Sequence, residues 1–382
     1  MIQVGEVTKD KLQLAMDATF AVKEAVARGG KPFLLRGRPS LSQAYATISG
    51  DSCLRYLEYG GLWGNPSLAD FLTREAADNV QTSDFPNILL NSMTKRLIQD
   101  YAEVPMDGLE KVYTKGHFAD YKMQDRVRMG YLLDLPVVTE GSNYAELARP
   151  TDELIQYAPV KHGNILSITE ETIRNDDLGQ ITGFTGRMAR AGRRTVKQFI
   201  TNFFLTNPNY MPDGVPWFNA AHNNLLALPL TPDALTTARA GMKLQTEKDS
   251  NKPLSLPLQW LMFAPALWAT ARAINQTDKW PTGPGTFEAN PWYHMFGVND
   301  EGLIENELLT EPGDWFFGCW PERCPCIEVG FLDGIDAPRM YFNSEPSSGA
   351  QPFSKDEIQF KVKHVFGGNV LDFRGAGYSA NH

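Results

Sequence analysis

One histidine and its neighbours come closest to a catalytic pattern in this sequence. His222 is followed by Asn223 and Asn224, and an imidazole beside two amides could act as a general base or could stabilise a turn. The chain contains no Gly-x-Ser-x-Gly elbow and no His-Glu-x-x-His pair, and its six histidines are scattered. We therefore favour the turn-stabilising role and expect no catalytic residue and no enzyme activity.

The cysteines form the second group whose chemistry has to be considered. The chain has four, of which Cys319, Cys324 and Cys326 lie close together while Cys53 lies far away. Four is too few for the disulfide framework of a secreted protein, and a Cys-x4-Cys-x-Cys spacing without a nearby histidine is not that of a zinc site. We expect reduced, partly buried thiols and no metal; the sequence alone does not decide whether Cys319, Cys324 and Cys326 form a bond or a metal site.

The glycine-rich stretches do not predict a nucleotide cofactor. Gly29-Gly30-Lys31 lacks the upstream glycine and the following hydroxyl residue of a phosphate-binding loop. Residues 375–380 resemble a dinucleotide fingerprint, but the two residues that follow are too few for the helix that such a fingerprint opens. We expect no cofactor.

Composition narrows the class of protein further. With 382 residues, 42% hydrophobic and 21% charged, the chain can bury a large core, and its net charge of −9 argues against a protein that grips nucleic acid. The longest uncharged run, residues 253–271, contains three prolines and is better interpreted as a buried strand at 259–264 followed by a helix starting at Pro265. We expect no signal peptide and no membrane span.

A long helix is the element around which the other elements are organised. Asn175, Asp176 and Asp177 provide capping groups at its start, and Asn207-Pro208 ends it about 30 residues later. One face of the helix is apolar and the opposite face is basic. The apolar face holds Ile181, Phe184, Met188, Ala191, Thr195, Val196, Phe199, Ile200 and Phe203; the basic face holds Arg187, Arg190, Arg193, Arg194 and Lys197.

The segments before and after this helix complete an α+β pattern. Residues 9–28 predict a helix, residues 40–79 predict short helices on glycine hinges, and residues 116–168 predict a long two-stranded excursion that needs a partner surface because it cannot bury itself. Towards the C-terminus, residues 281–285 predict a loop, and Gly367-Gly368 is expected to separate two strands.

These features, in this order, resemble the tailed-phage major capsid proteins of the Hong Kong 97 fold. The resemblance rests on the segment Ile168-Thr169-Glu170-Glu171-Thr172-Ile173-Arg174-Asn175-Asp176-Asp177-Leu178-Gly179, on Asp213-Gly214, and on Trp217-Phe218-Asn219 with His222 and Asn224-Leu225. Further landmarks lie at residues 82–86, 140–144, 328–334, 360–363 and 372–375. The resemblance covers about residues 80–378 and is closest to the subgroup encoded with, or fused to, a head-maturation protease.

The resemblance implies a division into arm, loop and two domains. The expected parts are an N-terminal arm (1–82), a first part of the peripheral domain (83–129), an extended loop (130–163), the peripheral domain with its spine helix (164–224), an axial domain (225–328), and peripheral strands with the C-terminus (329–382).

The resemblance also implies a function and partners. Many copies, as hexamers and pentamers, would form an icosahedral shell around double-stranded DNA in a virion assembled in the host cytoplasm. The expected partners are further copies of the chain, a portal protein, a scaffold and a cement or decoration protein, with non-specific contact to the DNA.

Three sets of site residues follow from the resemblance. Contacts between subunits are expected at Glu140, Gly141, Tyr144 and Arg149 of the extended loop; Asn175, Asp176 and Asp177 cap the spine helix; and Arg187, Arg190, Arg194 and Lys197 face either the lumen or an acidic neighbour. We favour the neighbour, because an acidic shell leaves DNA free to move.

One departure from the family pattern concerns covalent cross-links. Some members join their subunits through a lysine near the loop tip and an asparagine on a peripheral loop. Residues 134–160 contain no lysine and residues 344–360 contain no asparagine, so we expect a shell without cross-links.

Three other functions compete with this interpretation. An encapsulin-like compartment shares the fold, but the long arm and the Asn-Asp-Asp cap favour the phage form. A hydrolase using His222 would need a paired nucleophile, and a DNA-binding protein using the spine arginines would need a basic net charge. The sequence shows neither feature.

Overall fold

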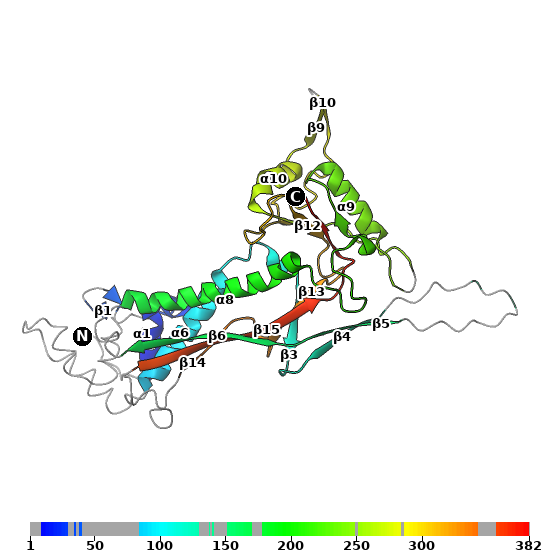
Figure 1. Ribbon diagram of the computed structural model, residues 1–382. Helices are drawn as coiled ribbons and strands as arrows, with labels where there is room; N and C mark the ends of the chain where they lie inside the picture. Colours follow the sequence, from blue (N-terminus) through cyan, green and yellow to red (C-terminus); the bar gives the residue numbers. More distant parts are fainter. Residues whose placement is uncertain are drawn as a thin grey trace, which may run out of the picture. The chain divides into compact units, whose positions relative to one another are not determined.

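A computed structural model describes most of the chain and confirms the α+β class (Figure 1). The described residues are 9–29, 34–35, 38–39, 84–129, 137, 140, 151–169, 178–248, 251–283, 286–342 and 357–381. The chain divides into two compact units. The first comprises Met1–Val104, Lys161–Arg194 and Ala337–His364, and the second comprises Pro105–Val160, Thr195–Asp336 and Val365–His382.

Helices α1 (Lys9–Thr19), α2 (Lys23–Ala27) and α6 (Asp84–Glu103) belong to the first unit, which also holds the short strands β1 (Leu34–Leu35) and β2 (Arg38–Pro39). The helix expected over residues 9–28 is broken, because Ala21 has a left-handed φ of 52° that an α-helix does not tolerate. The apolar positions of α1 and α6 form a buried cluster with residues of two strands. Its members include Met16, Phe20, Ile88, Met93, Leu97, Met340 and Phe360.

The predicted long helix is confirmed as α8 (Leu178–Thr206; Figure 1). Its residues fall in both units. It ends at Asn207, which has a φ of 44° and holds the following turn by accepting from Phe218 N at 2.7 Å. Pro208 then prevents the helix from continuing. The apolar residues Val196, Ile200 and Phe204 of α8 are buried in the second unit.

A five-stranded sheet forms the core of the second unit. Its strand order is β11 (Leu303–Glu305), β8 (Trp260–Phe263), β12 (Trp315–Gly318), β16 (Ala376–Ser379) and β7 (Leu225–Leu226). Helices α9 (Pro232–Leu244) and α10 (Trp268–Gln276) and the 3-10 turns η1 (Leu109–Lys111), η2 (Ala220–His222) and η3 (Pro265–Leu267) accompany it. The predictions of a buried strand near 259–264 and a helix entered at Pro265 are confirmed.

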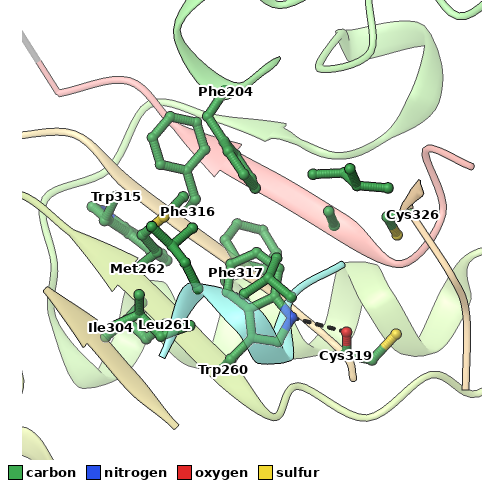
Figure 2. Packing of buried hydrophobic residues seen from close by; sticks show 14 of the residues in the cluster. Phe204, Trp260, Leu261, Met262, Ile304, Trp315, Phe316, Phe317, Cys319 and Cys326 are labelled. Carbon is green, nitrogen blue, oxygen red and sulfur yellow. Dashed lines mark hydrogen bonds between the residues drawn. The ribbon is translucent and has the colours of Figure 1, made fainter. Parts of the chain in front are cut away.

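Large aromatic side chains fill this core (Figure 2). Trp260, Trp315, Phe316 and Phe204 are buried, and the indole Nε1 of Trp260 donates a hydrogen bond to the carbonyl oxygen of Cys319 at 2.8 Å. That bond satisfies the one polar atom of an otherwise apolar side chain, as burial requires.

The second sheet has the order β14 (Arg339–Phe342), β15 (Glu357–Val370), β13 (Ile327–Leu332) and β3 (Thr114–Phe118), with β6 (Val160–Thr169) paired to β15. The prediction that Gly367-Gly368 separates two strands is wrong, because β15 runs through both glycines. A Cβ atom on Gly367 would lie 2.2 Å from the carbonyl oxygen of Ala158, and one on Gly368 would lie 2.3 Å from that of Glu328. These glycines allow neighbouring backbones to approach closely.

A second correction concerns the loop expected over residues 281–285, which is wrong for residues 281–283; residues 284 and 285 lie outside the described residues. Strands β9 (Lys279–Gly283) and β10 (Thr286–Ala289) pair antiparallel there as a hairpin. Pro281 lies within β9, and in a two-stranded ribbon a proline can occupy a position that does not have to donate to the ladder.

Candidate assembly surface

The base of the predicted extended loop is a two-stranded ribbon. Strands β4 (Gln124–Met129) and β5 (Asp152–Tyr157) pair antiparallel, with Val127 opposite Leu154 and Arg128 opposite Glu153. Because side chains alternate across a strand, the ribbon has two chemically different faces. The structure describes only Val137 and Glu140 between residues 130 and 150.

The outer face of this ribbon exposes apolar side chains. Val127 is 56% exposed, Met129 69% and Leu154 46%. Val127 and Leu154 are cross-strand neighbours, so together with Met129 they make a continuous apolar strip. We call Val127, Met129 and Leu154 the outer strip.

The inner face of the ribbon is held by a buried network of charges. Arg128 lies 2.6 Å from the Asp372 carboxylate, 2.9 Å from that of Glu247 and 3.5 Å from that of Glu153. Arg374 lies 3.2 Å from Glu153 and 3.0 Å from Asp372. These five side chains, which we call the root network, tie the two strands to segments more than 90 residues away in sequence.

Burial and pairing act against each other on the arginines of this network. Burial opposes the charge of Arg374, yet the carboxylates of Asp372 and Glu153 raise the pKa of its guanidinium above the ordinary value. Burial also opposes the charge of Arg128, but the nearby carboxylates, Asp372 above all, raise the pKa of its guanidinium. Both side chains therefore stay charged, and removing either would leave buried carboxylates without compensation.

A second anchor joins the ribbon to β13. The Arg126 guanidinium donates from Nη2 to Glu328 at 2.8 Å and from Nε at 3.0 Å, and the Glu328 side chain raises the pKa of Arg126. Gly116 makes room for this pair, because a Cβ atom there would lie 2.1 Å from Glu328 Oε1. The ring of Tyr157 packs edge-on against Phe118 with centroids 5.5 Å apart.

The basic face of α8 is present at three of the predicted positions. Arg187, Arg190 and Arg194 are exposed, and no described carboxylate lies within ion-pair distance of them. We call these three residues the basic stripe. Arg193 is half-buried, with its guanidinium 5.0 Å from the ring centre of Tyr101.

Lys197 is a correction to that prediction. Its ammonium group is buried between Asp107 at 2.6 Å and Glu307 at 2.5 Å. Burial opposes the charge, but the two carboxylates raise the pKa of Lys197. The side chain of Lys197 is paired with carboxylates of its own chain, so it faces neither the lumen nor a neighbour.

The remaining predicted site residues are only partly described. Glu140 is exposed. Gly141, Tyr144 and Arg149 of the loop and the cap residues Asn175, Asp176 and Asp177 lie outside the described residues.

His222 occupies a structural position. Its Nδ1 lies 3.0 Å from the Trp217 carbonyl oxygen, its Nε2 lies 2.9 Å from Asp213 Oδ2, and its ring stacks on Phe373 with centroids 3.8 Å apart. The side chain is buried, so neither nitrogen is available to a substrate. These contacts fit the turn-stabilising role.

The described residues were also searched for a metal site and a membrane span. Within them, no group of three or more histidine, cysteine, aspartate or glutamate side chains could hold a metal ion. Of the helices that the structure describes, none combines the length and the apolar character needed to cross a bilayer.

Comparison with known proteins gives one decisive match. A sequence model of the family described as phage capsid protein matches residues 152–379, which is more than half of the chain. A comparison with curated proteins finds no match.

Several solved structures are also similar. The capsid of a native GTA particle is 12% identical with a TM-score of 0.48, covering 73% of this chain and 91% of that one. A chain from Mycobacterium phage Patience is 14% identical with a TM-score of 0.46, covering 80% and 90%. A chain from Microbacterium phage Oxtober96 is 11% identical with a TM-score of 0.45, covering 72% and 90%. We base no argument on likenesses this distant.

Proposed function

Because residues 152–379 match the family's sequence model, the chain belongs to the phage capsid protein family, and we propose that it assembles as hexamers and pentamers without covalent cross-links. It is a major capsid protein and forms the shell of a virion. The family match favours this function over an encapsulin-like compartment.

The observation that best supports the proposed assembly is the exposure of the outer strip. Val127, Met129 and Leu154 lie side by side and exposed on a ribbon whose other face is fully engaged. Leaving three large apolar side chains in water is unfavourable by roughly 25 cal/mol for each Å² that could be buried. In the shell, the outer strip packs on a second copy of the chain.

The root network gives the ribbon a fixed direction for that contact. A strand pair held by Arg128, Arg374 and Arg126 loses little freedom on docking, so more of the burial energy is retained as affinity. The predicted contacts at Glu140, Gly141, Tyr144 and Arg149 would then continue the interface along the loop.

The basic stripe provides a second, electrostatic contact. Arg187, Arg190 and Arg194 point to an acidic surface on a neighbouring copy, and the net charge of −9 means that acidic surface is plentiful. The shell encloses double-stranded DNA, which makes only non-specific contact with it. A portal protein, a scaffold and a cement protein complete the list of partners.

The first experiment is electron microscopy with light scattering on the purified chain, expressed alone and with its neighbouring genes. We expect closed particles or rings of five and six subunits. A chain that stays a small monomer or dimer under every salt and partner condition would contradict the proposal.

A double variant tests the outer strip directly. Val127→Asp with Met129→Asp should abolish particles while the isolated subunit unfolds at the same temperature, because both side chains are exposed. Asp152→Asn, which changes a polar exposed residue of the same ribbon face, is the matched control and should assemble normally. Normal particles from the double variant would remove the outer strip from the interface.

A further inference from the structure

Three thiols converge on one glycine in the core of the second unit. Cys319, Cys324 and Cys326 are all free and buried (Figure 2 labels Cys319 and Cys326). A Cβ atom on Gly375 would lie 2.7 Å from Cys326 Sγ, 2.9 Å from Cys324 Cβ and 3.0 Å from Cys319 Sγ. Only glycine fits there, so its absent side chain leaves room for the three sulfur atoms to gather.

Cys324 differs from its two neighbours because it also touches the root network. Its Sγ donates to Asp372 Oδ2 at 3.2 Å, and Asp372 in turn pairs with Arg128 and Arg374. The neighbouring thiols of Cys319 and Cys326 lower the pKa of the Cys324 thiol, whereas Cys324 and burial raise the pKa of the Cys319 thiol. Burial and the neighbouring Cys324 sulfur raise the pKa of the Asp372 carboxyl to about 8.

We propose that Cys319 and Cys324 form an oxidation-dependent disulfide, with Cys324 as the attacking thiol and hydrogen peroxide as the oxidant. A virion leaves the reducing cytoplasm for surroundings in which disulfides persist, so the bond would form in the finished shell. The inference concerns one subunit and does not depend on how subunits are arranged.

Two thiols and one molecule of hydrogen peroxide would give one disulfide and two molecules of water. Cys324 gives its proton to Asp372, and the thiolate attacks one peroxide oxygen, breaking the O–O bond. Cys324 becomes a sulfenic acid, and the released hydroxide takes the proton from Asp372 to form water. The Cys319 sulfur then attacks the sulfenic sulfur, its proton joins the departing hydroxide as a second water, and the S–S bond forms.

Cys319 is the partner rather than Cys326 for a geometric reason. Cys326 instead directs its thiol to the carbonyl oxygen of Cys324, at 3.5 Å. Cys319 precedes a turn in which Cys324 N donates to Trp320 O, and that turn brings the chain back towards Cys319.

The test is thiol counting followed by peptide mapping on the full chain. After peroxide, denaturation and iodoacetamide, we expect the number of labelled cysteines to fall from four to two. Trypsin cuts after Arg323, so the bond would link the peptide containing Cys319 to the peptide that begins at Cys324. A reducing agent should separate them.

Single variants assign the bond to its two sulfurs. Cys326→Ser and Cys53→Ser should still lose two labels, whereas Cys319→Ser and Cys324→Ser should not form the link. The peptide of residues 324–339 carries both Cys324 and Cys326, so fragmentation of the linked peptides from the unmodified chain places the bond without depending on any variant folding. Four labels retained at peroxide levels that oxidise free cysteine, or a bond that involves Cys326 or Cys53, would overturn the proposal.

Discussion

Arg374 is the residue on which most of the root network depends. It is 3% exposed and pairs with Glu153 and Asp372, so its loss would leave two buried carboxylates facing each other with only Arg128 between them. The stabilisation is therefore best measured as the cost of breaking the network, because buried pairs gain little over apolar replacements.

We expect Arg374→Met to lower the free energy of unfolding by about 3–5 kcal/mol, the cost typical of breaking a buried ion pair. The measurement is urea denaturation of the unassembled subunit, followed by circular dichroism. Arg239→Met, which removes an exposed arginine of α9, is the matched control and should leave the free energy nearly unchanged. Equal midpoints for the two variants would mean that the network adds no stability.

Gly367 should not tolerate even the smallest side chain. An alanine Cβ there would lie 2.2 Å from the Ala158 carbonyl oxygen, a backbone atom that cannot move away on its own. Gly367→Ala should therefore lower the free energy of unfolding by about 1–3 kcal/mol. Gly241→Ala, inside α9 with no atom closer than 3.7 Å to the new methyl group, should instead raise it by up to about 1 kcal/mol. A Gly367→Ala variant as stable as the unmodified chain would mean that the close approach at Gly367 does not matter.

Elements with a strong periodicity were predictable, and elements fixed by distant contacts were not. The 3.6-residue pattern of α8 and the Asn207-Pro208 stop gave its length, because both signals are local. The break at Ala21 and the passage of β15 through Gly367-Gly368 were missed, since the first needs a left-handed residue that is not glycine and the second needs a neighbouring backbone. Glycine has two opposite uses in strands, and sequence alone does not distinguish them.

The basic stripe of α8 should be required for assembly. Arg187→Glu with Arg190→Glu and Arg194→Glu should prevent the formation of empty particles, because reversed charges would repel an acidic neighbour. Arg239→Glu on α9 is the control for a single exposed arginine and should assemble. Assembly of the unmodified chain should also weaken as salt rises, since exposed charges are screened beyond about 10 Å at 0.1 M.

The alternative role of the stripe predicts a different pattern. If the three arginines faced the lumen, empty particles of the triple variant would form normally, and only their DNA content and its salt dependence would change. Electron microscopy of particles made without DNA therefore separates the two roles.

At the scale of the whole molecule, the candidate site was only partly predictable. Three of the five root-network residues went unremarked, because Arg128, Glu153 and Glu247 lie in segments that only the fold brings together. Asp372 and Arg374 stood within a stretch singled out as a landmark. Charged residues at the inward positions of β4 and β5 were a signal that could have been followed. A strand that places Arg126 and Arg128 on its packed face requires buried carboxylates.

Lys197 was predicted to be exposed and is buried, again because of residues distant in sequence. A helical wheel groups Lys197 with the exposed arginines, but its ammonium group is buried in ion pairs with Asp107 and Glu307. A wheel reports directions around one helix and carries no information on which neighbours are acidic. A charged residue on a long helix can therefore be assigned to an interface only when its packing partners are known.

The shell should be held together without covalent cross-links between subunits. Residues 134–160 contain no lysine and residues 344–360 no asparagine, so the two side chains that could join subunits are absent from the expected positions. Purified particles, boiled in detergent with a reducing agent, should therefore run as a single band near 42.6 kDa. A ladder of multimers that resists both boiling and reduction would overturn the non-covalent shell. A ladder that disappears on reduction would instead indicate disulfides between subunits, distinct from the Cys319–Cys324 bond, which leaves the chain a monomer on the gel.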